Sequence, residues 1–224
     1  RDSSNTDSQE FSAGPNGFNG NLFVRDFETE QILTNAGFII EAEEEIYVSI
    51  RVSSTPVNFC GNQGCHGGAL VSKGESALGT KFRLGALQIR QNNQQNFGSV
   101  MATENQTIIN IQLPSGQTMR SGNNSATVTL NAGESYVFSS EDSSSPGYGI
   151  IGTLIESNKP IVVSCGSATG SFAVGSSSGG QDYGIDQIVG ADKVGSEYIF
   201  VKGEGGDSWE NILLISDQNN TTIN

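Results

Sequence analysis

The sequence predicts an all-β protein built from short antiparallel strands, and three observations support this fold class. Glycine contributes 29 of the 224 residues, nearly twice the usual share of about 7%. Apolar residues make up only 35% of the chain and occur in short runs. No segment carries an i, i+3, i+4, i+7 apolar stripe over three helical turns, so at most one short helical turn is expected, within residues 181–194.

Short runs rich in β-branched and aromatic residues, bounded by turn residues, are expected to be strands. Residues 1–21 lack any periodicity and are expected to be an irregular lead-in to one β domain over residues 22–224. Turn pairs such as Asn16-Gly17 and Ser115-Gly116 separate the runs. The expected strands are residues 21–26, 37–40, 46–52, 68–72, 81–84, 97–103, 107–113, 126–130, 134–139, 150–155, 161–165, 198–202 and 211–216.

Two internal repeats predict how the strands are organised. Residues 102–110 recur as residues 216–224, 114 positions later (216 − 102 = 114). Each copy is expected to be a β-hairpin, and a fainter match relates residues 68–73 to 152–157. We therefore expect repeated four-stranded antiparallel units in a propeller-like assembly, with tandem β-sandwiches as the alternative. The second copy stops within an expected strand, so the domain is expected to be truncated there.

The net charge and the hydropathy of the chain exclude two classes of partner. A net charge of −13, from 24 acidic and 11 basic residues, repels phosphate backbones, so no nucleic-acid binding is expected. No apolar run approaches the roughly 18 residues that a membrane-spanning helix needs, so no membrane insertion is expected. Arg1 is not followed by a signal-peptide pattern, and we expect that a signal peptide was removed or that the chain was cut from a longer precursor.

The three cysteines fall in two settings. Cys60 and Cys65 enclose a glycine-containing loop, which allows them to approach disulfide geometry, so we predict that they pair. The alternative is a metal site that uses both thiolates and the adjacent His66, which the single histidine and the absence of any CxxC disfavour. Cys165 lies in an apolar run and is expected to be buried.

Two acidic clusters and one tryptophan are the remaining candidates for binding. Calcium accepts carboxylate oxygens from irregular loops, although neither cluster matches an EF-hand and solvated turn residues are the simpler interpretation. Trp209 lies in a glycine-rich turn, where it either stacks against a sugar or covers one end of the core. No other cofactor is expected. The calcium candidates are Asp182, Asp186, Asp192, Glu204, Asp207 and Glu210.

The sequence contains no convincing catalytic motif. A Ser-His-Asp triad would have to use His66, beside the predicted disulfide. Residues 175–179 (GSSSG) match G-x-S-x-G, but they lie in a glycine-rich run with no following helix, which is expected to be a surface loop and not a nucleophile elbow. We therefore expect a protein that is not an enzyme. A glycosidase needs only two suitably spaced carboxylates, so a secreted carbohydrate-active enzyme remains a less favoured alternative.

Several stretches resemble the N-terminal domain family of IgGFc-binding proteins. Residues 180–202 are similar to the version in SprB-type giant surface adhesins of gliding Bacteroidetes, and the resemblance covers roughly residues 46–224. The other stretches are HGGALVSKG (66–74), ALGTKFR (77–83), SVMATEN (99–105), LNAGESY (130–136) and SNKPIVV (157–163).

The resemblance implies an extracellular protein displayed at the cell surface after type 9 secretion. Its expected function is that of a non-catalytic module of a large adhesin, in surface attachment or gliding motility. A structural spacer or tip element of a surface filament is the alternative. The implied partners are the remainder of its own large chain and associated surface proteins, together with a glycan or substratum. Antibody-Fc binding is not carried over.

Overall fold

The computed structural model describes residues 29–34, 36–37, 39–53, 67–89, 95–140, 147–170, 182–201, 203 and 212–223. Helix in these residues is limited to two short 3-10 turns, η4 (Gly74–Ala77) and η5 (Ala191–Lys193). The predicted all-β class is confirmed. The strands are β1 (Ile32–Leu33), β2 (Ser49–Ser53), β3 (Gly67–Val71), β4 (Gly79–Arg83), β5 (Asn96–Ala102), β6 (Thr107–Gln112), β7 (Ser125–Leu130), β8 (Ser135–Ser139), β9 (Leu154–Gly170) and β10 (Asp182–Ile188).

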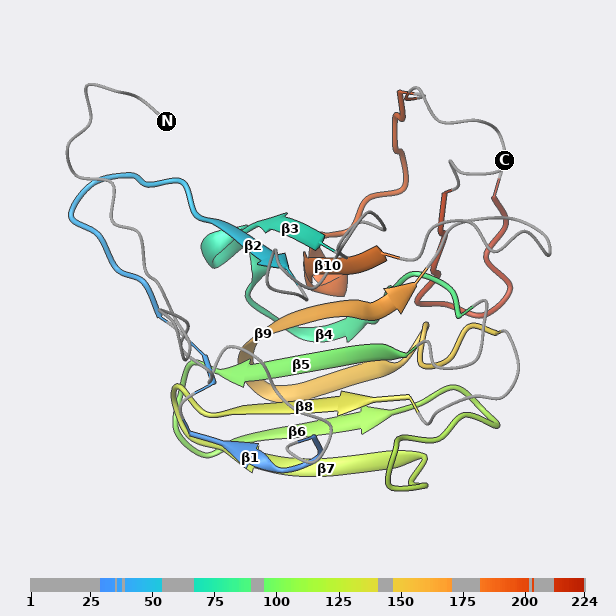
Figure 1. Ribbon diagram of the computed structural model, residues 1–224, viewed down its shortest axis with the longest axis horizontal. Coiled ribbons are helices and arrows are strands. Elements are labelled where there is room, and N and C mark those ends of the chain that lie inside the picture. The colour runs from blue at the N-terminus through green and yellow to red at the C-terminus, as the bar shows by residue number, and fades with distance from the viewer. Residues whose placement is uncertain are drawn as a thin grey trace, which may run out of the picture.

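Eight of these strands form one antiparallel sheet (Figure 1). Its order is β1-β8-β5-β9-β6-β7, and β4 and β10 also pair with β9. Strands β2 and β3 form a separate antiparallel pair, and β3 lies beside β10. Strand β9 is therefore the centre of the fold, with four pairing partners.

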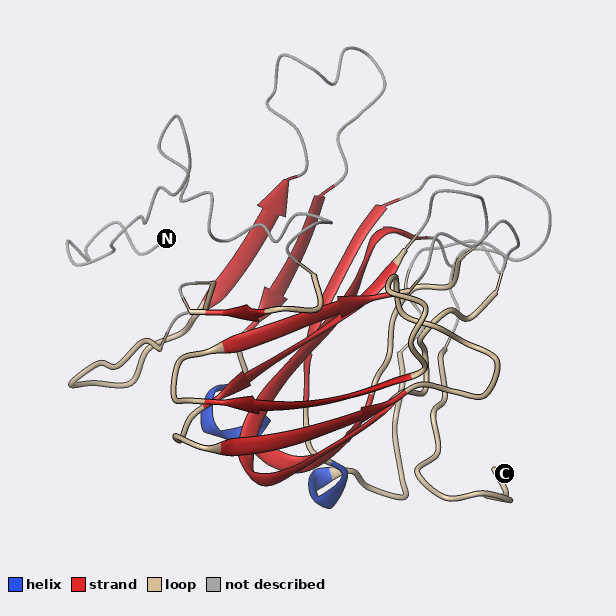
Figure 2. Cartoon of the chain, turned by 90° about the horizontal axis from the view of Figure 1, so that it is seen from below, coloured by secondary structure: helices blue, strands red, loops and turns tan. Residues whose placement is uncertain are grey.

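The long strand β9 can pair with four other strands because it bends at residues 158–160. Residues 154–157 pair with β6 and with most of β4, whereas residues 161–170 pair with β5 and β10; β4 crosses the bend, since its Gly79 pairs with Ile161. Strands β5 and β6 run in opposite directions although both are antiparallel to β9 (Figure 1), so the two halves of β9 also run in opposite directions. The sheet folds over on itself here and nearly closes into a barrel (Figure 2).

The core fills the inside of this bent sheet. Strand β6 alternates buried and exposed residues, and β5 alternates buried and half-buried ones, as strands with one face on a core must. In β9, Ile155 before the bend and Ile161, Val163, Cys165 and Ser167 after it are buried, so both halves contribute to one core. Its largest fully buried side chains are Phe82, Phe138, Leu84, Ile89, Ile109, Ile111, Met119, Leu130, Ile150, Ile155 and Ile161.

Cys165 lies in this core, as expected, and is a free thiol. Burial, reinforced by the negative charge of Asp186, raises the pKa of the Cys165 thiol to about 12. A thiol with this pKa stays protonated at neutral pH, and only the thiolate is a good nucleophile. Cys165 therefore acts as a small apolar core residue.

Several strand predictions were wrong in detail. The two runs at 150–155 and 161–165 contribute to one bent strand, and the strand β10 at residues 182–188 was not expected. The short helical turn expected within residues 181–194 is η5. The short β1 was missed. The described residues of 37–40, 198–202 and 211–216 form no strand, and residues 21–26 lie outside the described part.

The expected grouping into four-stranded propeller units is not seen, since the described strands form one bent eight-stranded sheet and a separate pair. Strands β5 and β6 are joined by a tight turn at 103–106, but they do not pair with each other as the expected hairpin requires. Each pairs instead with a different half of β9. Alternation along a strand determines which face is buried, but not which distant strand it pairs with.

Candidate functional site

The long connections of the barrel gather at one end. Strands β4, β6 and β8 end there, and the registers that pair Arg83 and Gln112 with Leu154 bring these ends together. At the opposite end the turns are short, residues 103–106 and 131–134. We call the described parts of the long connections, residues 84–89, 113–124 and 147–153, the loop end. Loops carried by a rigid scaffold are the usual location of binding residues.

Asn96, the first residue of β5, anchors the loop end from inside. It is fully buried, and its side-chain nitrogen donates to the Leu87 carbonyl (2.6 Å) and to the Ser167 hydroxyl (3.1 Å). Its backbone N–H donates to the Ser140 hydroxyl (3.1 Å), and its carbonyl accepts from the Ser140 N–H (2.9 Å). One buried asparagine thereby ties two of the loops to both β5 and β9.

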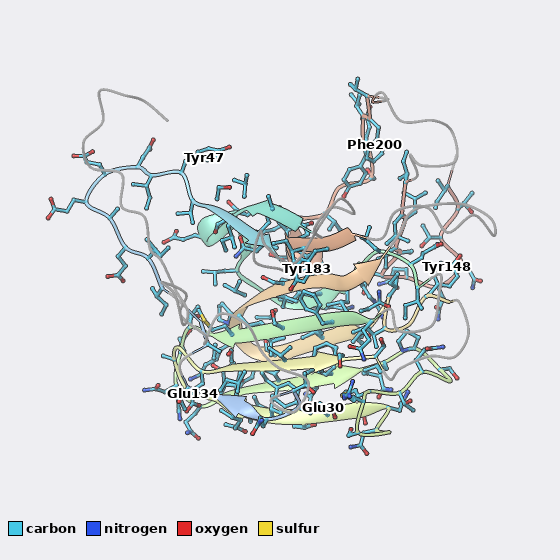
Figure 3. The ribbon with its side chains drawn as sticks, in the orientation of Figure 1. Glu30, Tyr47, Glu134, Tyr148, Tyr183 and Phe200 are labelled. Carbon is cyan, nitrogen blue, oxygen red and sulfur yellow. The ribbon has the colours of Figure 1, made fainter. Side chains whose placement is uncertain are left out.

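The loop around Tyr148 packs directly on this anchor. Gly147 and Ile89 exchange two backbone hydrogen bonds (2.8 and 2.9 Å). Gly149 has φ +54°, and a Cβ atom there would lie 2.1 Å from the Asn96 side-chain oxygen, so only glycine fits. The Tyr148 side chain, by contrast, is 61% exposed and lies on the surface (Figure 3). The loop thus presents an aromatic ring on a firmly held backbone.

The connection between β6 and β7 is held by its own polar side chains. Asn124 donates to the Gln117 carbonyl (3.1 Å), and Met119 is fully buried beneath the loop. The surface here is a shallow, open depression offering amide and hydroxyl groups, which suits polar contacts with a protein or a glycan. Its lining residues are Gln112, Leu113, Ser115, Gly116, Gln117, Thr118 and Asn124.

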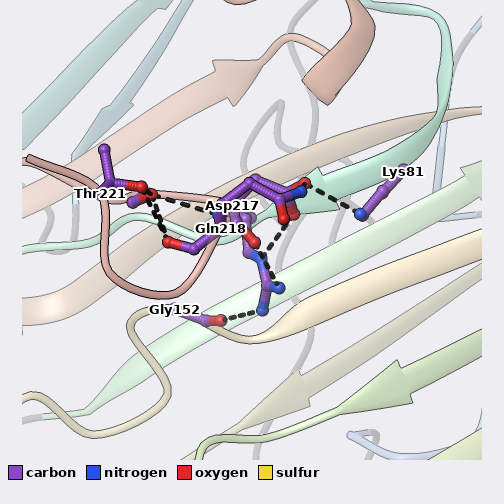
Figure 4. A network of polar contacts seen from close by, with 7 residues as sticks. Lys81, Gly152, Asp217, Gln218 and Thr221 are labelled. Carbon is purple, nitrogen blue, oxygen red and sulfur yellow. Dashed lines mark hydrogen bonds and ion pairs between the residues drawn. The ribbon is translucent and has the colours of Figure 1, made fainter.

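A second polar cluster, which we call the Asp217 clamp, joins the C-terminal segment to β4 (Figure 4). The Asp217 carboxylate accepts from Lys81 (2.9 Å) and from Arg83 (3.0 Å). Arg83 also donates to the Asp217 and Gly152 carbonyls (3.2 and 3.3 Å). Hydrogen bonds from these two cations lower the pKa of the Asp217 carboxyl below its ordinary value.

We predict that the clamp opens in acid. Because the pKa of Asp217 is lower when the segment is docked, docking is fully stabilised above the pKa of a free aspartate, about 3.9. It is lost as the pH falls through the lower, docked value. Amide hydrogen exchange of residues 215–221 at decreasing pH should show this opening.

Two variants test the clamp at neutral pH. Asp217→Asn should open the segment at pH 7 and remove most of its pH dependence. Asp186→Asn, which removes an exposed ion pair to Lys73, should leave the exchange of residues 215–221 unchanged. Equal exchange in Asp217→Asn and the parent chain would contradict the assignment.

Most of the predicted site residues lie outside the described part of the chain. These are Cys60, Cys65, Glu204, Asp207, Trp209 and Glu210, together with the Asp182 side chain.

The structure does place two of the calcium candidates. Asp186 lies on β10 and is paired with Lys73 (2.7 Å), while Asp192 lies in η5. Within the described ranges, no three His, Cys, Asp or Glu side chains lie close enough to hold a metal. Calcium binding stays a prediction.

Sequence reasoning missed both polar clusters. Asn96 follows an Asn/Gln-rich run that is typical of a loop. Within β5 it lies an even number of residues from Val100 and Ala102, and this places it on their buried face. Asp217 was noticed only as part of a repeat.

The described chain also contains no helix of the length and apolarity needed to cross a bilayer.

Comparison with known proteins gives one match. No curated protein and no solved structure is similar enough to match. The family model described as IgGFc binding protein matches residues 67–224, well over half of the chain. The match begins at β3 and includes β4 to β10, the loop end and the Asp217 clamp. The chain therefore belongs to the IgGFc binding protein family.

Proposed function

We propose that this chain is a non-catalytic binding module of a large secreted adhesin, and that the loop end contacts the target. Family membership suggests a surface or secreted module that binds other proteins. The observation that carries the proposal is the gathering of the long connections at one end, with Tyr148 exposed above the buried Asn96 anchor. A rigid scaffold lowers the entropic cost of binding through such loops.

The chemistry of the loop end favours binding over catalysis. Its described residues offer an aromatic ring, amides and hydroxyls, and they include no carboxylate. The resemblance of residues 180–202 to SprB-type adhesins of gliding Bacteroidetes supports a role in attachment or gliding, after type 9 secretion. Weak contacts at many copies of such a module add up through multivalency.

We predict that Tyr148→Ser weakens attachment. Exposed tyrosines at the centre of an interface commonly contribute about 2 kcal/mol, so binding should fall by more than about tenfold. The assay measures retention of beads coated with the chain on surfaces coated with protein or with glycan. Protease or periodate treatment of the surface then identifies the class of target.

The matched control is Tyr47→Ser. Tyr47 is also exposed, but it lies on a segment far from the loop end (Figure 3). Its loss should leave attachment unchanged. The proposal fails if both variants bind as the parent does, or if both weaken binding equally.

A spacer function is the second candidate, because the Asp217 clamp joins the C-terminal segment to β4. Deleting the region from the full-length protein separates the two. Lost attachment with normal surface display supports binding, whereas normal attachment by a shortened surface structure supports the spacer.

A further inference from the structure

The internal repeat of this chain is much longer than nine residues. Residues 37–50 align without gaps with 152–165, and both contain G-x-x-I-E followed by I-x-V-S. Residues 67–84 align with 183–200 and share three glycines, at positions 68/184, 74/190 and 79/195. With the match at 102–110, three segments spread over 37–110 have counterparts in the same order within 152–224.

The structure repeats along with the sequence. Strands β2 and β3 pair in the same register as the second half of β9 pairs with β10. The 3-10 turns η4 and η5 follow at matching positions. The corresponding pairs are Ser49–Val71 with Ser164–Gln187, and Ile50–Leu70 with Cys165–Asp186.

The turn after the repeated strand is also the same. Gln106 and its counterpart Asn220 both have positive φ, 56° and 61°, which is uncommon outside glycine. In each copy a threonine hydroxyl donates to the carbonyl three residues earlier, at 2.7 and 2.9 Å. The second copy therefore adopts the local structure of the first.

The barrel does not coincide with one repeat. Strands β4 to β8 belong to the first repeat, residues 37–151. The second repeat begins at residue 152, and β9 is its first strand. The first repeat is thus closed by a strand of the next one. Strands β3 and β10, which occupy equivalent positions in the two repeats, lie side by side at the junction.

The second repeat contains the sequence counterparts of β4 and β5, but its described residues 198–201 and 212–216 form no strand and lack the partners of those strands. Tyr198 corresponds to the fully buried Phe82 but is 59% exposed, and Leu214 corresponds to the buried Val100 but is 55% exposed. Phe200 stands out from the barrel on the same segment (Figure 3). At the other end of the chain, Ile40 is 54% exposed, although its counterpart Ile155 is fully buried.

We infer that residues 198–201 and 212–223 belong to the first strands of a second barrel, completed by β7-, β8- and β9-type strands of a further tandem repeat. In the first barrel, the equivalents of these residues pair with β7, β8 and β9. The only β7–β9 set in the described chain is already used by β4, β5 and β6. The occupant should carry the G-x-x-I-E and I-x-V-S pattern of β9, and the resulting protein is a row of interlocked barrels.

The first barrel also specifies the shape of the occupant. Gly98 lies under the Phe138 ring, where a Cβ atom would be 2.5 Å from the ring. The counterpart of Gly98 in the second repeat is Ile212. The completing β8-type strand must therefore carry a side chain smaller than phenylalanine at this position.

The test supplies the proposed strands to the full chain. Residues 111–170 are fused after Asn224, which is the counterpart of Asn110, in one version unchanged and in another with the graft's Phe138→Ala. Amide hydrogen exchange is measured for residues 198–200 and 212–216, with β5 to β8 of the first barrel as the internal reference. Exchange should slow by more than about tenfold, most clearly in the Phe138→Ala version.

Two graft variants check that a β9-type strand causes the protection. Val163→Asp in the graft, on the buried face of β9, should abolish it, and Val162→Asp, on the half-buried face, should preserve it. No slowing in either fusion would overturn the inference. If residues 198–200 and 212–216 of the unextended chain are already as protected as β5 to β8, and the chain forms dimers, the inference is overturned in favour of a second copy as the occupant. Attachment through Tyr148 is independent of all these outcomes.

Discussion

Replacing Phe138 by alanine is expected to lower the free energy of unfolding by about 3–5 kcal/mol. The side chain is fully buried, and its ring fills the space above Gly98. Its removal leaves a cavity between β5 and β8 that the surrounding strands close only in part. For a domain of this size the melting temperature should fall by about 6–20 °C, measured by circular dichroism.

Two comparisons make this prediction specific. Val137→Ala alters the neighbouring side chain on the opposite face of β8 and should cost much less. Gly98→Ala should be strongly destabilising alone but much less so beside Phe138→Ala, because the methyl then meets only Leu84 closely (3.0 Å). Equal effects of Phe138→Ala and Val137→Ala would show that this part of the core is misassigned.

The second large effect is expected at Asn96. Asn96→Ala removes the side-chain hydrogen bonds to the Leu87 carbonyl and the Ser167 hydroxyl, although Ser167 still donates to the Leu87 carbonyl (3.1 Å). The loss should be about 1–3 kcal/mol. Hydrogen exchange of residues 84–89 and 147–151 should accelerate well below the melting temperature, because these loops lose their common anchor.

The control for this variant is Asn110→Ala. Asn110 lies on the exposed face of β6 and accepts only from Thr127 in the described contacts (2.8 Å), so its loss should change little. If the loops exchange at the parent rate in Asn96→Ala, the anchor is not what holds them. Reduced attachment by Asn96→Ala at a temperature where the barrel is folded would link the anchor to the loop end's function.

Strands β5 to β8 show how much of the fold can be predicted from local sequence. Each was predicted within one or two residues, because alternating apolar residues and flanking turn residues are recorded in adjacent positions. Strand β10 was not, since DYGIDQI lacks apolar alternation. It forms a strand because the edge of β9 is available to pair with it.

The functional candidates divide in the same way. The sequence singled out acidic loops, two cysteines and Trp209, because charged, sulfur-containing and aromatic side chains suggest chemistry wherever they occur. It did not single out Asn96, whose importance comes from burial, or Asp217, whose two partners on β4 are more than 130 positions away. Neither property is visible in the neighbouring residues.

The sequence by itself determined the all-β class, the family, the inward faces of most strands and the existence of a repeat. These depend on composition, on alternation with period two and on similarity between segments, all of which can be read along one chain. Only the tertiary structure decided that β9 bends and pairs with four strands, that the long loops share one end, and that one repeat closes the barrel of another. Those features depend on pairing between distant strands, whose backbone hydrogen bonds are nearly independent of residue type.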